Sequence, residues 1–361
     1  MPTTPVLDLH RQSGAVIEET FGWQLPAVYS SLADEYEAIT RRVGLLDRSY
    51  TGRLELKGVD ALDLLDRLST NKLDDLDAAG RGMYTVLTSN KGRILDLLFV
   101  LKLEDRFLVL TGPEHRRKVA DWIDFYTFAE DVSVSDVTGE LAMLAVTGPK
   151  SPSLVEAVVG PTAASVPRYG STTADIDGVD VRIVRTDFAA LPGYDLIVPA
   201  RRAARLWSRL MERGAGFELR PVGMRALDLV RVERGVPVHG RELTEDHNPL
   251  EADLTEFISF NKGCYIGQEV VARLNTYDKV QRRLVGLSWG QWDGPVPGAS
   301  LHLDGAKAGE VTSKAWSPRR GQGIGLGYVR QAHAVQGTRL TTESPDGRLD
   351  VQVERLPFPS G

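Results

Sequence analysis

The chain has 361 residues, of which 42% are hydrophobic and 25% are charged, and its formal net charge is −6. This length and balance are typical of a globular protein with two or three domains. A general nucleic-acid scaffold is disfavoured because such proteins normally carry a basic excess, so we expect no nucleic-acid partner.

The start of the chain and its apolar stretches do not indicate export or a membrane span. Residues 1–14 lack the basic start and apolar core of a secretory signal. The longest apolar stretch, 94–101, contains Asp96 and is far shorter than the roughly 20 residues of a membrane helix. A single cysteine cannot form an intrachain disulfide, and no Cys/His spacing predicts a zinc site. We therefore expect a cytoplasmic protein with no membrane partner.

The first part of the chain predicts a mixture of helices and strands. Residues 32–43 carry charges in a helical pattern, and the alternation in 53–57 is typical of a half-buried strand with Arg53, Glu55 and Lys57 facing outward. Asp60 is a plausible N-cap for a following helix. The further elements expected here are a helix at 61–68, strands at 84–88, 94–103 and 106–111, and a helix at 114–126.

Strands and helices alternate again from residue 132, ending with a predicted helix at 201–213. From residue 283 onward the pattern changes to short strand-like runs between Gly, Pro and Asp turns, and the one helix candidate in this region is 330–334. Residues 290–300 are expected to form a loop inside this last region. The pattern predicts an α+β chain that ends in a small β-barrel or sandwich.

Chemistry-bearing residues are densest between 231 and 273, whereas phosphate-binding loops, nucleophile elbows and spaced histidine pairs are absent from the sequence. Lys262, Cys264, Gln268 and Glu269 supply a donor, a thiol, an amide and a carboxylate at short range. Two interpretations stay open from the residues alone. They either form a binding loop, or they are a buried small cysteine followed by the start of a surface helix.

The segment 261–274, NKGCYIGQEVVARL, resembles the KGCYxGQE signature of the YgfZ-type folate-binding proteins. Those proteins assist iron–sulfur cluster assembly and are relatives of the glycine-cleavage T-protein, an aminomethyltransferase. Four further stretches resemble the T-protein family: VGLLDRSYTGRLELKGVDALDLLDRLSTNKL, AVTGPKS, PGYDLIVP and EVTSKAWSPRRGQGIGLGYV.

The resemblance implies a fold and a domain division. We expect an α+β protein of three domains in a ring around a central tetrahydrofolate pocket, the third domain being a small barrel. The expected domains are 1–50 with 132–220, which bind folate, 51–131 with 221–279, and 280–361.

The resemblance also implies a catalytic position. In the T-protein, an aspartate in the strand GGxxDDL steers the folate nitrogen that attacks. In this chain, aligning the glycines puts Asp96 on the first carboxylate and Leu97 on the second, which is the catalytic one by this alignment. Neighbours on a strand point to opposite faces, so Asp96 replaces the missing group only if the strand contains a bulge.

Folate-binding residues are implied in the same way. Asp195 occupies the place of the glutamate that pairs with the pterin edge, with Tyr194 beside it, and Arg231 matches an arginine that could clamp the folate carboxylates. Arg225 and Arg241 are alternatives for that clamp. Asp195 could instead be a solvent-facing strand residue, and each arginine could be a surface charge.

Cys264 has three interpretations: a nucleophile activated by Lys262 or a helix start, one thiolate ligand to a partner's cluster, or an inert structural residue. We expect Cys264 and Lys262 to contact an iron–sulfur protein or assembly factor, with Gln268 and Glu269 among the folate-binding residues. The resemblance thus predicts a tetrahydrofolate-binding protein that supports iron–sulfur enzymes. The alternatives are an aminomethyltransferase and a scaffold without folate.

Overall fold

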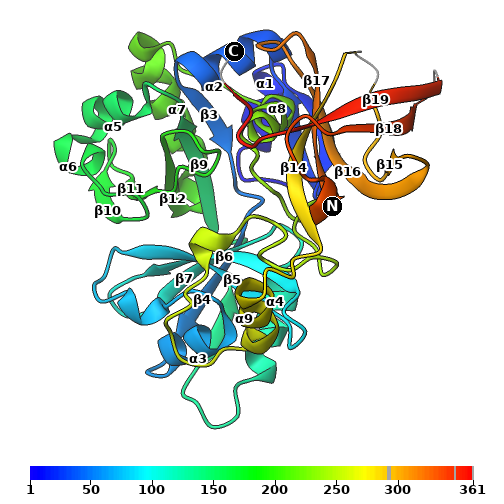
Figure 1. The fold of residues 1–361 in the computed structure, drawn as a ribbon. Helices are drawn as coiled ribbons and strands as arrows, with labels where there is room; N and C mark the ends of the chain where they lie inside the picture. The colour runs from blue at the N-terminus through cyan, green and yellow to red at the C-terminus, as the bar shows by residue number, and fades with distance from the viewer. Residues whose placement is uncertain (291–293, 345–346, 360–361) are drawn as a thin grey trace. The chain divides into compact units, whose positions relative to one another are not determined.

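The computed structural model describes residues 1–290, 294–344 and 347–359, and the chain forms two compact units (Figure 1). The first unit contains residues 1–66, 72–85 and 97–227; the second contains 67–71, 86–96 and 228–361. Of the loop expected at 290–300, residues 291–293 lie outside the described residues, and 294–299 form no helix or strand. Among the described residues, no helix is long and apolar enough to cross a membrane. The division into three domains and the cytoplasmic location stay predictions.

A six-stranded sheet is the centre of the first unit. Its strands, in spatial order, are β10 (Ser171–Asp175), β11 (Asp180–Arg185), β12 (Gly193–Pro199), β9 (Leu141–Thr147), β3 (Gly44–Asp47) and β13 (Arg220–Pro221). The helices that follow its strands are α5 (Ser151–Val159), α6 (Pro161–Ala164) and α7 (Ala203–Gly214). The strands β9 and β12 are buried on both faces, which is why they are apolar almost throughout. One face packs on α7 through Leu206, Trp207 and Leu210, and the other carries a second apolar cluster around Phe99.

A five-stranded antiparallel sheet contributes the Phe99 cluster. Its strands, in order, are β5 (Gly82–Thr88), β6 (Ile94–Lys102), β7 (Phe107–Thr111), β4 (Gly52–Lys57) and β8 (Ser133–Asp136). Residues 86–88 and 94–96 of β5 and β6 are assigned to the second unit. The other helices and strands that begin in the first unit are α1 (Leu7–Gln12), β1 (Val16–Thr20), β2 (Trp23–Val28), α2 (Leu32–Arg41), α3 (Ala61–Leu68), α4 (Arg116–Phe125) and α8 (Met224–Arg234). The helices and strands expected between residues 32 and 126 are confirmed, with ends that shift by a few residues.

One detail of the predicted β4 is wrong. Arg53 was expected to face water, but its side chain is fully buried. Its guanidinium donates to the carbonyl oxygens of Ser49, Thr51 and Thr138 at 2.7–2.9 Å. Burial lowers the pKa of Arg53 to about 10. The side chains of Lys57 and Glu55 on the same face are 52% and 20% exposed, so the alternation fails at Arg53, where carbonyl groups accept the bonds of a long cationic side chain and make its burial tolerable.

A closed six-stranded barrel forms most of the second unit. Its strands, in order, are β14 (Arg282–Trp289), β17 (Gln322–Arg330), β16 (Ala306–Ser317), β15 (Ser300–Leu303), β18 (Arg339–Ser344) and β19 (Gly347–Glu354). A Cβ atom at Gly323 would lie 2.0 Å from the Trp289 ring, which explains the glycine at this position of β17. The expected α+β fold with a C-terminal barrel is confirmed.

The remaining short elements are mostly single turns. They are α9 (Gln268–Thr276) and the 3₁₀ turns Leu73–Asp75, Ala200–Arg202, Ala215–Phe217, Thr255–Phe257 and Gln331–His333. The strand β19 was missed from the sequence, although Leu349, Val351 and Val353 alternate with polar residues and are buried in the barrel.

Candidate functional site

A buried ion pair lies on the Phe99 side of the six-stranded sheet in the first unit. Asp195 in β12 is fully buried, and Nη1 of Arg48 donates to both of its carboxylate oxygens at 2.6 Å. The hydroxyl of Thr186 donates to the same carboxylate at 2.7 Å. Asp195 is therefore an internal, fully engaged carboxylate, and it does not face solvent.

The strand register explains why these groups meet. Asp195 pairs with Ala145 of β9, and Ala145 pairs with Leu46 of β3. Paired residues share a face of the sheet, and Arg48 lies two residues beyond Leu46, so it emerges on the side of Asp195.

Aromatic rings surround this ion pair. The Arg48 guanidinium lies 3.8 Å from the centre of the Phe188 ring. The rings of Tyr84 and Tyr169 are in edge contact, with centroids 5.2 Å apart, and both pack against the Phe99 cluster. Burial raises the pKa of the Tyr84 hydroxyl to about 12, and the charges of Arg48 and Asp195 also act on it. Tyr84 is therefore a neutral hydrogen-bonding phenol at physiological pH.

The backbone that carries Arg48 is held on both sides. Its N–H donates to the Met143 carbonyl at 2.8 Å. The preceding Asp47 is bonded to His10 at 2.9 Å and accepts from the Ser49 N–H at 2.9 Å. His10 in turn contacts the Tyr29 hydroxyl at 2.8 Å. These buried contacts set where the Arg48 side chain begins, and burial raises the pKa of Tyr29, so that hydroxyl is not activated for chemistry.

Tyr194 is directed away from this site. It belongs to the apolar cluster of the α7 face together with Leu196 and Val198, and its hydroxyl reaches the Ala164 carbonyl at 3.4 Å. Since neighbours on a strand alternate, Tyr194 and Asp195 lie on opposite faces of the sheet. The structure gives Tyr194 a packing role.

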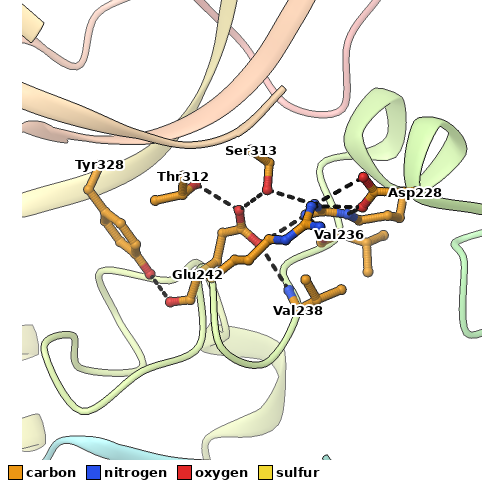
Figure 2. Close-up of polar contacts among 9 residues, drawn as sticks. Asp228, Val236, Val238, Glu242, Thr312, Ser313 and Tyr328 are labelled. Carbon is orange, nitrogen blue, oxygen red and sulfur yellow. Dashed lines mark hydrogen bonds and ion pairs between the residues drawn. The ribbon is translucent and has the colours of Figure 1, made fainter. Parts of the chain in front are cut away.

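Arg231 in the second unit is part of a buried network, shown in Figure 2. Its guanidinium donates to Glu242 at 2.9 Å, to Asp228 at 2.8 Å and to the Ser313 hydroxyl at 2.6 Å. The side chain of Glu242 is fully buried and also accepts from Thr312 at 2.7 Å. Arg231 thus has carboxylate partners of its own, and this arrangement ties α8 to the barrel strand β16.

Asp96 and Leu97 point in different directions from β6. Asp96 is fully buried in the second unit, where its carboxylate lies 2.8 Å from Nδ1 of His239. Leu97 alternates with Asp96 and therefore shares a face with Phe99 and the tyrosine pair. The register of β6 against β7 runs evenly from Phe99 to Lys102, and the face that carries the aromatic cluster has Leu97 where the family alignment expects a carboxylate.

The motif with the single cysteine forms an exposed turn before α9. Cys264 is exposed, as is Glu269 in the first turn of the helix. The Lys262 ammonium donates to the carbonyl oxygens of Ser69 and Asn71 at 3.0 and 2.7 Å, so it fastens that segment of the second unit. Gln268 donates to the Gly263 carbonyl at 3.3 Å.

The sequence therefore found the carboxylate of this candidate site but missed its partners. Thr186 and Phe188 lie outside the stretches that resemble the family, and Arg48 lies inside the first of them as one charge among several. The only local signal was Arg48 itself, a charge directly after the apolar strand GLLD.

Comparison with known proteins identifies the family. The GCVT N-terminal domain matches residues 6–262, and the glycine cleavage T-protein C-terminal barrel domain matches residues 282–359. The aminomethyltransferase of Halothermothrix orenii is 32% identical over 99% of this chain and 100% of its own length. That of Halalkalibacterium halodurans is 30% identical over 98% of this chain and 97% of its own.

A solved structure shares the fold along the whole chain. The glycine cleavage system aminomethyltransferase T from Bartonella henselae superposes with a TM-score of 0.87 at 25% identity, covering 99% of this chain and 98% of that one. Both domain matches and the full-length relatives agree, and the chain therefore belongs to the glycine cleavage T-protein family.

Proposed function

We propose that this chain binds a reduced folate beside Asp195 and transfers a one-carbon unit from an aminomethyl donor. The observation that carries folate binding is a buried carboxylate among aromatic rings on one face of the six-stranded sheet. The full-length relatives at 30–32% identity, both aminomethyltransferases, support the transfer reaction.

The residue types around Asp195 fit the pterin end of a folate. A pterin presents an N–H beside an amino group on one edge, and a carboxylate accepts both with parallel bonds. Phe188 and Tyr84 offer ring faces and edges for a flat heterocycle. A bound reduced folate supplies the nitrogen that accepts the one-carbon unit. In the structure, Arg48 bonds to the Asp195 carboxylate at the place where the pterin would bond, so Arg48 has to move aside when a pterin binds.

Titration with tetrahydrofolate tests the binding proposal. We expect the wild type to bind and Asp195→Asn to bind about tenfold or more weakly, because an amide offers a single acceptor oxygen. Asp180→Asn is the matched control, since Asp180 is exposed on the neighbouring strand β11. If the folded wild type does not bind tetrahydrofolate, the proposal is refuted, and the alternative of a scaffold that binds no folate remains.

A second candidate function, support of iron–sulfur enzymes by a folate-binding protein of the YgfZ type, is favoured by two observations. Leu97 replaces a carboxylate on the face of the aromatic cluster, which weakens the case for transfer. Cys264 is exposed in the turn of the KGCYIGQE motif, where a partner can reach it. The partners of this candidate would be iron–sulfur proteins or assembly factors.

One assay separates the two activities. Tetrahydrofolate-dependent transfer of the methylene group from an aminomethyl-lipoyl carrier protein, well above the rate of Asp195→Asn, supports the transferase. A folate-binding protein without turnover, whose Cys264→Ser variant fails to support iron–sulfur enzymes in cells, supports the second candidate. Full cellular support by Cys264→Ser would contradict it.

A further inference from the structure

The guanidinium of Arg48 resembles, in shape and donor pattern, the edge of the ligand that Asp195 would bind. It is planar and carries N–H groups that the Asp195 carboxylate accepts. It also lies over the Phe188 ring at 3.8 Å, as a flat heterocycle would. A residue of the chain itself therefore occupies both recognition elements, the carboxylate and the aromatic face.

The match between Arg48 and Asp195 is incomplete. A single nitrogen, Nη1, reaches both carboxylate oxygens, whereas the most favourable arginine pairs use two parallel N–H bonds. Nε of Arg48 is buried and finds no acceptor among the described residues. A ligand with an N–H beside an amino group can give each oxygen of Asp195 its own donor. That ligand satisfies the carboxylate better than Arg48 does.

Arg48 is also placed so that it can leave. It follows the last residue of β3, and 13% of its side chain is exposed, whereas Asp195 is fully buried. A long arginine side chain that is not fully buried can turn its charge toward water by rotation about its side-chain bonds, without movement of the sheet. The carboxylate has no such freedom.

We propose that Arg48 is a specificity-determining gate that closes the Asp195 site and opens only for a planar ligand with a 2-amino-4-oxopyrimidine edge. This inference rests on the proposed function, because it assumes that a reduced folate binds beside Asp195. The edge is shared by pterins and guanine. Ligands that lack the paired N–H groups cannot replace Arg48 on the carboxylate and are excluded.

The test compares the wild type with Arg48→Gln, which keeps a polar but shorter side chain and removes the charge. We expect Arg48→Gln to bind tetrahydrofolate about tenfold or more tightly, since the ligand no longer displaces a paired cation. The gain should disappear in Arg48→Gln with Asp195→Asn. Tetrahydropterin without the folate tail and guanosine are titrated alongside: binding of both assigns recognition to the shared edge, and a guanosine-only response overturns the folate assignment.

The possible outcomes distinguish the gate from the proposed function. If the wild type binds tetrahydrofolate and Arg48→Gln binds it equally or more weakly, the gate is refuted while folate binding stands. If Arg48→Gln binds and the wild type does not, the gate holds and folate binding by the native protein fails. If neither folded protein binds, both fail.

A second variant decides the case in which Arg48→Gln does not fold. Arg48→Lys keeps a positive charge beside Asp195 but has no planar guanidinium to lie over the Phe188 ring. We expect Arg48→Lys to bind tetrahydrofolate more tightly than the wild type, because its pairing with the carboxylate is weaker. Binding equal to or weaker than that of the wild type refutes the gate.

Discussion

The carboxylate of Glu242 accepts hydrogen bonds from four groups of the second unit, and Glu242→Gln tests what holds the barrel to α8. Glu242 accepts from Nη1 of Arg231, from the Val238 N–H, and from the hydroxyls of Thr312 and Ser313, at 2.6–3.1 Å (Figure 2). Glutamine preserves the shape of the side chain and removes its charge.

The expected loss follows from burial. The side chain of Glu242 is fully buried and that of Arg231 is 5% exposed, so little solvent screens their attraction. Removing one charge from such a pair costs about 3–5 kcal/mol. The hydroxyls of Thr312 and Ser313 can rotate to accept from the new amide, and Asp228 still faces Arg231. We therefore expect the lower end, about 3 kcal/mol in the free energy of unfolding.

The assay is urea denaturation followed by tryptophan fluorescence, since Trp289 is buried in the barrel. Glu310→Gln is the matched control on β16, because Glu310 is 33% exposed and pairs with the exposed Lys307. We expect a change below about 1 kcal/mol for that control. The double variant Arg231→Met with Glu242→Gln should lose less stability than the two single losses added together.

The reasoning would be refuted by a Glu242→Gln variant that unfolds at the same urea concentration as the wild type. Additive losses in the double variant would also contradict it, because they would mean that Arg231 and Glu242 do not depend on each other. In that case Arg231 would be available for a ligand, as the family resemblance first implied.

Three further predictions concern other parts of the chain. Burial raises the pKa of Asp47, but the bond and charge of His10, together with the bonds from Thr4 and the Ser49 N–H, outweigh burial and hold that pKa below the ordinary 3.8. The contribution of Asp47 to stability is therefore present above pH 3.8 and is lost as the pH falls through the folded value. Asp47→Asn should therefore lower the melting temperature at pH 7, and this decrease should become progressively smaller below pH 3.8. A decrease in melting temperature that does not depend on pH would contradict this. Gly267→Ala should destabilise the second unit by about 1–3 kcal/mol in urea denaturation, because Gly267 has φ +86° and a Cβ would lie 2.5 Å from the Ser89 carbonyl oxygen. Gly263→Ala is its control, since no described atom lies within 4 Å of a Cβ there, and an equal loss would show that this contact is not the cause. Leu97→Asp should raise the rate of methylene transfer about tenfold or more, because it restores a carboxylate on the Phe99 face. Leu97→Asn, which adds no carboxylate, should not raise the rate. Equal rates for the two variants would contradict the alignment of the strand.

Local pattern was enough to predict most helices and strands, as well as the family. The leucine spacing in α3 and the short strand-like runs between turns in the barrel are properties of short windows, and the motif segments are read directly from the residues. The strand β19 was missed because a single short alternating run is a weak signal when it is read in a short window by itself.

Only the tertiary structure decided which charges are internal and which groups they contact. Asp195 and Arg48 are 147 residues apart, and no short window contains both. Arg53 looked like a surface residue because its strand alternates, yet its side chain is fully buried and donates to carbonyl oxygens of Ser49 and Thr138. The physical reason is that periodicity identifies the faces of an element, while burial and partners depend on how strands from distant parts of the chain pair.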